Sequence, residues 1–521
     1  MSISKEHYDF IIIGSGFGGS VSALRLAEKG YSVLVIEKGK RFKSDDFSKT
    51  NWNLKKWLWL PSFRLYGIQK LTIFKHASVL SGVGVGGGSL VYANTLPKPK
   101  SPFFNKGSWA NLQNWEQVLE PYYETAWKML GADINPFLGD SDLIFQDLAN
   151  KINKPQSFEA TKVSVYFGKP SITVDDPYFD GKGPTRTGCK FCGSCMTGCL
   201  HNAKNTLDKN YLYLAEKLGV EVLPEHEVID VIPNNDNTNY QVIYKQSTQY
   251  FGKKSVISTS NIVFAGGVLG TVPLLLKLKK SRLLNLSNRV GEMVRTNNES
   301  LILNTSLDKN KDFSEGIAIG SILELDENSH LEPVRYGKGS GFWRLLMLPL
   351  ITEKNFFKRI LKLIITPFTS PIKWLRVWFV KDFAKSTSVL LFMQHLDSTL
   401  KIKRGFLSSY TAIDQGEPPT AFIKEAHEIA KIHAKMTNSK SQVMSLETIT
   451  GIPSTAHILG GAVMGKTKDE GVIDAENKIF GYPNLYVCDG SMISANLGVN
   501  PSLTITAITE HAMSLIPIKH S

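Results

Sequence analysis

"YDFIIIGSGFGG", residues 8–19, joins an apolar run to a glycine-rich turn. The run YDFIII has the composition of a buried parallel strand. The turn places Gly14, Gly16 and Gly19 in G-x-G-x-x-G register. In that register the first glycine allows a tight turn, the second lets the backbone approach a pyrophosphate, and the third lets a helix pack on a strand. We therefore expect a dinucleotide to bind at this turn.

The following residues complete a strand–turn–helix–strand unit. SVSALRLAEKG has helical periodicity and ends at Gly30, and YSVLVIE is a second strand that ends at Glu37. The helix N-terminus offers unpaired N–H groups to phosphates, and Glu37 can accept hydrogen bonds from ribose hydroxyls. An ordinary glycine turn is the alternative, but the order of the elements argues against it. FAD and NAD share this fingerprint, so the motif leaves the choice between them open.

A second glycine cluster lies in SGVGVGGGSLVYANTLPKP, which begins at Ser81. Because glycine has no side chain, the backbone at these positions can lie directly against a flat ligand or a pyrophosphate. A flexible loop is the alternative, but flexible linkers rarely contain so many apolar residues. A second close approach suits a cofactor clamped from two sides. The glycines are Gly82, Gly84, Gly86, Gly87 and Gly88.

Polar residues near the C-terminus follow a similar pattern. NLYVCDGS is typical of a strand that delivers Asp489 and Gly490 to a turn, and NPSLTITAITEHAM predicts a helix with Pro501 at its first position and Asn500 as its cap. The segment STAHILGGAVMG contains His457. Taken alone, His457 is best interpreted as a structural histidine, and Asn500 as a helix cap.

Five segments together resemble GMC-type FAD oxidoreductases, and among them cholesterol oxidases of the bacterial type. The resemblance covers both ends of the chain and much of the middle, and is weakest at residues 300–450. The segments are GSGFGGSVSALRLAEKGYSVLVIEKG, GVGVGGGSLV, FAGGVLGTVPLL, HILGGAVMG and YVCDGSMISANLGVNPSLTITAITE.

The resemblance implies non-covalent FAD in an elongated pocket. Where the secreted oxidases continue after the second turn with Asn-Gly, this chain has Tyr92 and Ala93, so Asn94 is the neighbour expected to contact the flavin. The other implied FAD positions are Gly14, Gly16, Phe17, Gly18 and Gly19 in the first turn, Glu37 at the ribose, Gly88 and Ser89 in the second turn, Val228 at the adenine, and Asp489 and Gly490 beside the flavin.

The resemblance also implies that His457 and Asn500 hold a substrate hydroxyl over the flavin. A neutral imidazole can accept the hydroxyl proton, while the flavin takes the hydride. Oxidation of a cholesterol-type substrate is followed in this family by a shift of the ring double bond, which needs a base. Glu332 lies at about the right place in the sequence; a surface glutamate beside Arg335 is the alternative.

These residues predict FAD-dependent oxidation of a sterol 3β-hydroxyl to the ketone, with Δ5 to Δ4 isomerisation as a further expectation. Molecular oxygen or another carrier would accept the electrons. A second hypothesis is a dehydrogenase of another bulky alcohol that passes electrons to a quinone or a protein. A third is a flavin- or lipid-binding protein without catalysis, and the presence of both His457 and Asn500 argues against it.

Four of the five cysteines lie in GCKFCGSCMTGC, with C-x2-C-x2-C-x3-C spacing. This spacing is typical of iron–sulfur ligands, but in ferredoxins the fourth cysteine serves another cluster and a proline follows it. Leu200 follows here, and a zinc site would be cramped. Thiols without a metal are the preferred interpretation; an iron–sulfur cluster and zinc stay open. The cysteines are Cys189, Cys192, Cys195 and Cys199.

The formal charge of +13 favours acidic partners. No nucleic-acid-binding motif accompanies it, so no nucleic acid is expected. Residues 342–385 hold nine Lys or Arg against two acids, and NFFKRILKLII has the pattern of an interfacial helix at an anionic membrane. An amphipathic cap over a sheet is the alternative. Residues 51–61 have the same character and predict a second flap.

The N-terminus does not read as a signal peptide, and no stretch reaches the uncharged length of a membrane span. We expect a cytoplasmic protein with peripheral membrane contact. A chain of 521 residues is longer than one hydrophobic core usually accommodates, so two domains are expected. The expected fold is α/β: a discontinuous, doubly wound Rossmann-like FAD-binding domain, residues 1–98, 185–300 and 440–521, with a substrate domain of mixed sheet plus helices, residues 99–184 and 301–439.

Overall fold

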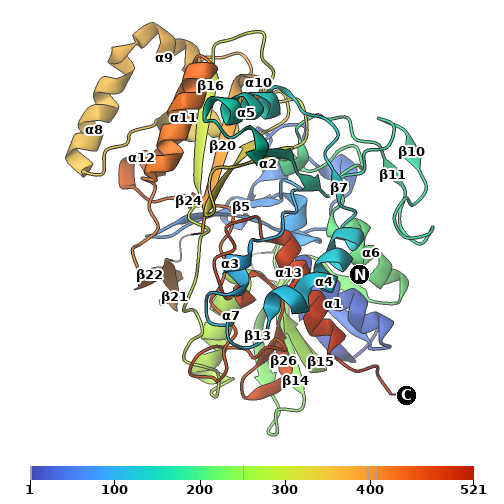
Figure 1. Ribbon diagram of the computed structural model, residues 1–521. Helices are drawn as coiled ribbons and strands as arrows, with labels where there is room; N and C mark the ends of the chain where they lie inside the picture. The colour runs from blue at the N-terminus through green and yellow to red at the C-terminus, as the bar shows by residue number, and fades with distance from the viewer. Residues whose placement is uncertain (1–2, 250–251, 396–397, 407, 521) are drawn as a thin grey trace.

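The computed structural model describes residues 3–249, 252–395, 398–406 and 408–520. Its two large sheets occupy opposite halves of the molecule, with one cavity between them. Figure 1 shows the eight-stranded sheet in the lower half and the seven-stranded sheet in the upper half. The expected α/β class is confirmed.

The eight-stranded sheet has a parallel centre and an antiparallel edge. Its order is β12 (Glu221–Leu223), β2 (Val33–Ile36), β1 (His7–Ile13), β15 (Lys254–Phe264), β14 (Tyr240–Gln246) and β13 (His226–Pro233). The end of β15 also pairs in parallel with β26 (Tyr482–Val487), to which β25 (Lys478–Ile479) pairs antiparallel. Strands from both ends of the chain therefore build one sheet, as the doubly wound prediction requires.

Helix α1 (Phe17–Glu28) lies directly after the first glycine turn, where the sequence predicts a helix. Close packing explains the glycines: a Cβ on Gly19 would stand 2.1 Å from the Gly14 carbonyl oxygen, and one on Gly18 would stand 1.7 Å from that of Cys488. α1 contacts α6 (Tyr211–Lys217) and α13 (Ser502–Ser514), and α13 contacts α4 (Trp115–Met129).

The C-terminal helix differs in one detail from the prediction. α13 begins at Ser502, with Pro501 at the N-cap, so Pro501 is not its first residue. Asn500 precedes the cap and does not cap the helix. Its side-chain amide is instead used in a contact with the other domain, described below.

The seven-stranded sheet supplies the apolar wall of the cavity. Its order is β19 (Met347–Pro349), β23 (Ser439–Met444), β16 (Ser300–Ser306), β20 (Thr387–Gln394), β18 (Ser329–Val334), β17 (Ser321–Glu324) and β8 (Phe158–Ala160). A mixed sheet was expected here, but every pairing recorded among the described residues is antiparallel.

The two faces of this sheet follow strand alternation. Leu301 and Leu303 of β16 face the cavity, whereas Ile302 between them packs in a separate core cluster with α11 (Lys424–Met436) and α5 (Asp140–Lys151). The sheet thus presents one apolar face to helices and the other to the cavity. The boundaries of the two domains stay a prediction.

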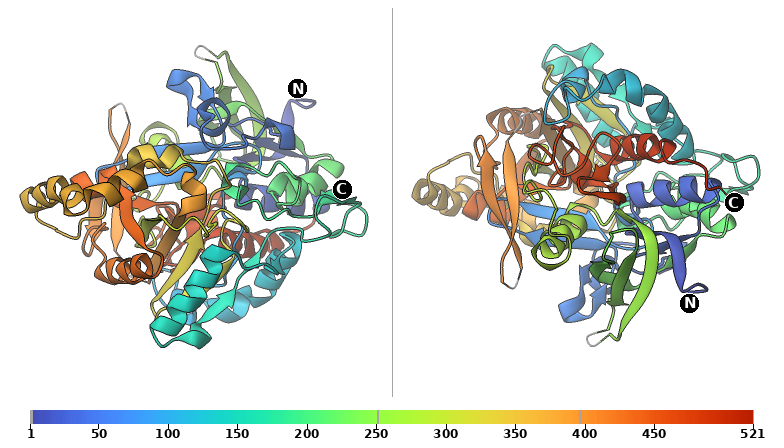
Figure 2. Two further views of the ribbon diagram at one scale, coloured as in Figure 1. Left: turned by 90° about the horizontal axis from the view of Figure 1, so that it is seen from above. Right: turned by 90° about the horizontal axis from the view of Figure 1, so that it is seen from below.

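Two helices project from the rim of this half. Figures 1 and 2 show α8 (Phe356–Ile365) and α9 (Pro371–Trp378) as an arm at the left edge of the molecule. The interfacial helix predicted at NFFKRILKLII is therefore present as a helix, capped by the Asn355 side chain. Among the described residues, no helix is long and apolar enough to cross a membrane.

The predicted flap at residues 51–61 is mostly wrong. Trp57 and Trp59 are buried, and Trp57 packs edge-on against Trp343 in the core of the second half.

The remaining helices and strands of the described residues are α2 (Leu54–Trp57), α3 (Ser101–Phe104), α7 (Val268–Ser281), α10 (Phe383–Ser386), α12 (Ser445–Thr450), β3 (Trp59–Leu60), β4 (Leu65–Tyr66), β5 (Gln69–Ile73), β6 (Ser78–Gly82), β7 (Asp133–Ile134), β9 (Lys162–Val163), β10 (Thr173–Val174), β11 (Arg186–Thr187), β21 (Thr399–Arg404), β22 (Ser409–Gln415) and β24 (Ser454–Thr455).

Candidate active site

One cavity of about 1010 Å³ runs between the two sheets. Its volume exceeds that of most single-ligand pockets. Glycine turns line one end, and side chains of the seven-stranded sheet line the other. The apolar end is lined by residues that include Leu301, Leu303, Val334, Trp343, Val389 and Leu391. The cavity has room for an elongated cofactor and for a bulky apolar substrate beside it.

The glycine-rich end fits a pyrophosphate-bearing cofactor. A Cβ on Gly16 would meet no atom within 4 Å, although the residue lies inside the fold and lines the cavity. The two glycine turns touch there, because a Cβ on Gly87 would stand 2.6 Å from the Cα of Gly16. The sequence predicted that two glycine turns bring their backbones close to one cofactor, and this geometry agrees with that prediction. The residues present fit FAD.

Glu37 is buried at the end of β2, and the chain itself fixes its carboxylate. Ser15 donates to Oε2 from its backbone nitrogen at 3.0 Å and from its hydroxyl at 2.8 Å, and the Gly39 nitrogen donates to Oε1 at 2.8 Å. These bonds hold the acid beside the glycine turn. Val228 of β13 also lines this end of the cavity, as expected of an adenine contact.

Asp489 joins three segments around the predicted flavin position. Its Oδ2 accepts from the Gly267 nitrogen at 2.9 Å and from the Thr271 hydroxyl, and its Oδ1 accepts from the Ser491 nitrogen at 2.8 Å. Burial raises the pKa of Asp489 above its ordinary value. The carboxylate therefore anchors the start of α7 to the turn that places Gly490 on the cavity wall.

His457 lines the cavity, and its ring also contacts the buried carboxylate of Glu299. Its Nδ1 lies 2.7 Å from Oε2 of Glu299, which leaves Nε2 as the ring nitrogen for a substrate. The backbone nitrogen of His457 also donates to Glu299, at 3.3 Å. Burial disfavours the charged imidazole, but the Glu299 carboxylate outweighs burial and raises the pKa of His457 above its ordinary value.

Asn500 lines the same cavity as His457 and bonds a second buried carboxylate. Its Nδ2 donates to Oε2 of Glu332 at 3.2 Å. Glu332 is completely buried in β18, and its Oε1 stands 3.7 Å from Nε2 of His330. The surface-glutamate alternative is wrong, because Arg335 pairs instead with Asp142 at 2.7 Å.

Not every predicted site residue reaches the cavity. Ser89 uses its hydroxyl inside the turn, donating to the Gly86 carbonyl at 2.7 Å and accepting from the Leu207 nitrogen at 3.0 Å. Asn94 is buried away from the cavity, whereas its neighbours Ala93 and Thr95 line it. Gly19 packs α1 on the turn, and Glu332 lies behind Asn500. Those that line the cavity are Gly14, Gly16, Phe17, Gly18, Glu37, Gly88, Val228, His457, Asp489, Gly490 and Asn500.

Sequence reasoning missed Glu299. It lies just before β16, in a polar run with no motif of its own. The structure brings it to His457 because the backbone of Arg295 pairs with that of Leu459, which fixes the two loops side by side. The only feature of the sequence that could have pointed to Glu299 is a general one, a carboxylate at the start of a buried strand.

The four clustered cysteines line a second, small cavity. All five cysteines are free, and no three His, Cys, Asp or Glu side chains in the described parts of the chain are placed to hold a metal ion. Burial raises the pKa of Cys195 to about 11. For Cys199 burial acts in the same direction, but the Lys209 charge and neighbouring backbone N–H groups lower its pKa below the ordinary value.

Comparison with known families agrees with this geometry. Two models described as GMC oxidoreductase match residues 184–291 and 411–509, and an NAD(P)-binding Rossmann-like domain matches residues 12–48. A solved structure of pyridoxine 4-oxidase from Mesorbium loti has a TM-score of 0.60 at 14% identity, over 97% of this chain and 98% of that one. It shares the fold.

Curated relatives align over nearly the full length. A cholesterol oxidase of Acinetobacter baumannii is 40% identical, covering 100% of this chain and 96% of its own. A cholesterol oxidase of Mycobacterium tuberculosis is 42% identical, covering 99% and 92%. A long-chain-alcohol oxidase of Arabidopsis thaliana is 24% identical, covering 97% and 66%. The chain therefore belongs to the GMC oxidoreductase family, as an FAD-dependent alcohol oxidoreductase that resembles cholesterol oxidase.

Proposed function

We propose that this enzyme oxidises the 3β-hydroxyl of a sterol to the ketone. One observation carries the proposal: His457 and Asn500 line the same cavity as the apolar side chains of the seven-stranded sheet. Fused rings would bury their apolar surface against the seven-stranded sheet, while the single hydroxyl reaches the two polar side chains. The names of the relatives at 40% and 42% identity support the same substrate class.

Each of these residues has a separate role in the proposed oxidation of the alcohol. FAD, held by the glycine turns that line the cavity, would supply the acceptor for the hydride of the carbinol carbon. His457 holds the substrate oxygen at Nε2 and accepts its proton, which requires the imidazole to start neutral. Glu299 fixes the ring through Nδ1 and stabilises the imidazolium once the proton has moved. Asn500, which lines the same cavity, orients the same oxygen.

Glu332 is the proposed base for isomerisation of the ring double bond. It is a completely buried carboxylate, and its Oε1 has no hydrogen-bond partner among the described residues. It does not line the cavity, since the Asn500 amide stands in front of it. The double-bond shift therefore requires Asn500 to turn aside or the substrate to settle deeper after oxidation.

A dehydrogenase of another bulky alcohol is the second candidate. The long-chain-alcohol oxidase among the relatives and the apolar chamber both suit such a substrate. The protein without catalysis, the third hypothesis above, is not favoured, because His457 and Asn500 both line the cavity.

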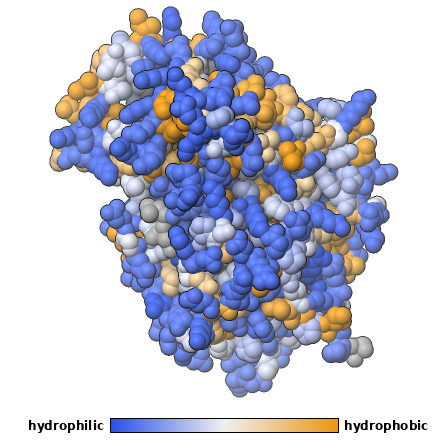
Figure 3. Space-filling view, viewed as in Figure 1, coloured by the Kyte–Doolittle hydropathy of each residue, from blue (hydrophilic) through white to orange (hydrophobic). Residues whose placement is uncertain are grey.

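We also propose that the α8–α9 arm docks on an anionic lipid surface. Its polypeptide leaves the body after β19 (Met347–Pro349) and returns at α10 (Phe383–Ser386), and both Met347 and Phe383 line the cavity. Figure 3 shows hydrophobic side chains on this arm, at the upper left. The large exposed apolar residues are Phe356, Phe357, Leu361, Ile364, Phe368, Ile372, Leu375 and Phe379, and the neighbouring cations are Lys354, Lys358, Lys362, Lys373, Arg376 and Lys381.

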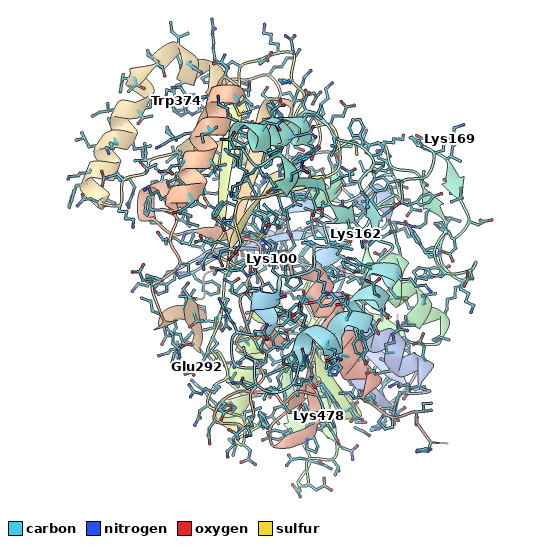
Figure 4. All side chains as sticks on the ribbon, in the orientation of Figure 1. Lys100, Lys162, Lys169, Glu292, Trp374 and Lys478 are labelled. Atoms are coloured by element: carbon cyan, nitrogen blue, oxygen red, sulfur yellow. The ribbon has the colours of Figure 1, made fainter. Side chains whose placement is uncertain are left out.

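The inner face of the arm is already anchored by other groups. Arg359 donates to the Lys354 carbonyl at 2.8 Å and to the Ile449 carbonyl at 3.1 Å. Trp374, labelled in Figure 4, is buried, and the Lys440 ammonium lies 5.3 Å from its ring centroid. A cap over a sheet would bury its apolar face, so the exposed face favours a lipid partner.

Anaerobic bleaching of the flavin tests the substrate. The purified enzyme is mixed without oxygen with 3β-hydroxysterols, their 3α-epimers, and long-chain primary alcohols. We expect rapid bleaching by the 3β-sterols alone, with a 3-ketosteroid as product. Bleaching only by long-chain alcohols would replace the sterol proposal with the second candidate.

A further inference from the structure

We propose that Tyr336 binds a second polar group of the substrate, a ketone on the ring most distant from the reacting hydroxyl. The inference rests on the proposed oxidation of a 3β-hydroxyl and narrows its substrate class, from sterols with an alkyl tail to steroids with a carbonyl at the far end. Polar groups that line the cavity and have no use in the fold carry it.

Two paired strands give the distance from the reacting end of the cavity. Glu332 of β18, which bonds Asn500, is paired with Leu391 of β20. Four residues before Leu391, Thr387 still lines the cavity. At about 3.3 Å per residue, these two positions of β20 lie about 13 Å apart. The four fused rings of a steroid have a comparable length, so the last ring would lie near Thr387.

Tyr336 and Ser340 belong to this remote end, and both line the cavity. Tyr336 follows Val334 of β18 by two residues, in the direction that leads away from the reacting end. The Ser340 carbonyl accepts at 3.2 Å from the nitrogen of Ala384, which lies three residues before Thr387. Both segments therefore meet the end of the sheet where the far ring would lie.

The Tyr336 side chain faces an enclosed space. It keeps part of its surface free and lines the cavity, yet burial raises the pKa of its hydroxyl to about 12. A free surface in such a buried setting is the wall of an internal cavity. From there the hydroxyl can donate a hydrogen bond to a carbonyl oxygen of the ligand.

Two neighbouring polar groups are also unused. Oγ of Ser340 and Nε1 of Trp343 are buried and have no hydrogen-bond partner among the described residues. The Trp343 indole lies near the Tyr336 hydroxyl, so one ligand oxygen can accept from both. Burying polar groups without partners costs free energy, and a ligand oxygen that accepts from them offsets that cost.

The chemistry of this wall selects a neutral acceptor. An indole N–H donates only, and a tyrosine hydroxyl can donate as well. The cavity-lining residues between 334 and 347 include no charged side chain, so a carboxylate would be buried there without a cation. An alkyl tail would leave the polar groups unpaired. A ketone oxygen fits both the donors and the apolar surroundings.

Two steroids that differ only by one ketone test the site. 3β-Hydroxyandrost-5-en-17-one carries the ketone on its last ring, and androst-5-en-3β-ol lacks it. We expect anaerobic flavin reduction of the wild type to half-saturate at a concentration about three- to tenfold lower for the ketone. In Tyr336→Phe this difference should disappear, while the limiting rate and the half-saturation by the steroid without the ketone stay unchanged.

Tyr410→Phe is the matched control. Tyr410 lies in β22, is exposed and does not line the cavity, so the preference for the ketone should persist in this variant. No preference in the wild type, or the same preference in Tyr336→Phe as in the wild type, would overturn the Tyr336 site.

Calorimetric binding separates this inference from the proposed oxidation. The oxidised holoenzyme is titrated with androst-4-ene-3,17-dione and androst-4-en-3-one, which have no hydroxyl to oxidise. We expect the dione to bind about three- to tenfold more tightly to the wild type and equally in Tyr336→Phe. This preference without oxidation of any 3β-hydroxysteroid would overturn the proposed function and leave the Tyr336 site. Oxidation of both 3β-alcohols with equal binding of the two 3-ketosteroids would overturn the Tyr336 site alone.

Discussion

The Nδ1 atom of His457 lies 2.7 Å from Oε2 of Glu299, and Glu299 is fully buried. A buried carboxylate at this distance fixes both the tautomer and the orientation of the imidazole. It also stabilises the protonated ring, so the proposed proton acceptor is tuned by a residue that does not line the cavity.

Replacing Glu299 with Gln should shift the pH dependence of flavin reduction. The carboxylate raises the pKa of His457, so the neutral, proton-accepting ring accumulates only above that raised value. Without the charge the pKa falls, and the acid limb of the profile should move to lower pH by about one unit or more. Stopped-flow flavin reduction between acid and neutral pH measures the shift.

Glu292→Gln is the matched control. Glu292, labelled in Figure 4, pairs with Lys401 at 2.8 Å away from the cavity lining. Its profile should equal that of the wild type. Superimposable profiles for Glu299→Gln and the wild type would remove Glu299 from the mechanism.

His457→Ala should retain FAD and lose turnover. The imidazole is the proposed proton acceptor, and loss of such a group costs about 10²–10⁴-fold in rate. The visible flavin spectrum checks cofactor content, and anaerobic bleaching with a sterol checks the rate. A near-normal rate would exclude His457 as the proton acceptor.

Glu332→Gln should separate the two reactions of a sterol substrate. The amide keeps the shape and the contact with Asn500 but cannot carry a proton between ring carbons, so the unconjugated ketone should accumulate. Chromatography and the ultraviolet absorbance of the conjugated enone distinguish the products. Undiminished enone formation would mean that another group carries the proton.

Of two glycine substitutions, one should prevent FAD binding and the other should destabilise the fold. Gly16→Val adds a side chain into open space on the cavity wall, so we expect a folded chain of nearly normal melting temperature that has lost FAD. Gly14→Ala adds a Cβ 2.4 Å from the Ala265 carbonyl oxygen at a φ of +104°, so the apoprotein itself should melt lower. Differential scanning calorimetry with flavin absorbance checks both. Normal FAD content in Gly16→Val would place the cofactor elsewhere.

The double variant Phe357→Ser, Phe368→Ser should lose binding to anionic vesicles. These side chains are 80% and 76% exposed on the projecting arm, where they would insert among lipids. Co-sedimentation at low salt measures the loss, and added salt should weaken wild-type binding as well. Leu218→Ser, an exposed apolar residue after α6, is the control and should bind normally. Equal binding by all three proteins would leave the arm without a lipid role.

The local parts of this fold could be predicted from the sequence. The strand, glycine turn and helix at residues 8–28 depend on backbone conformations and apolar patterns that lie within one segment. The same holds for the strand before Asp489 and for the helix at NFFKRILKLII. The start of α13 was missed by one residue, because the Asn500 amide serves a distant carboxylate and not the helix end.

The catalytic geometry was decided by tertiary structure. Glu299 and His457 are 158 positions apart, and Glu332 and Asn500 are 168 apart. Whether such residues meet depends on the path of the chain between them, which local patterns do not encode. The same reason applies to the cysteines: their spacing was visible in the sequence, but the turns at Phe191, Gly193 and Gly198 decided that all four face one cavity.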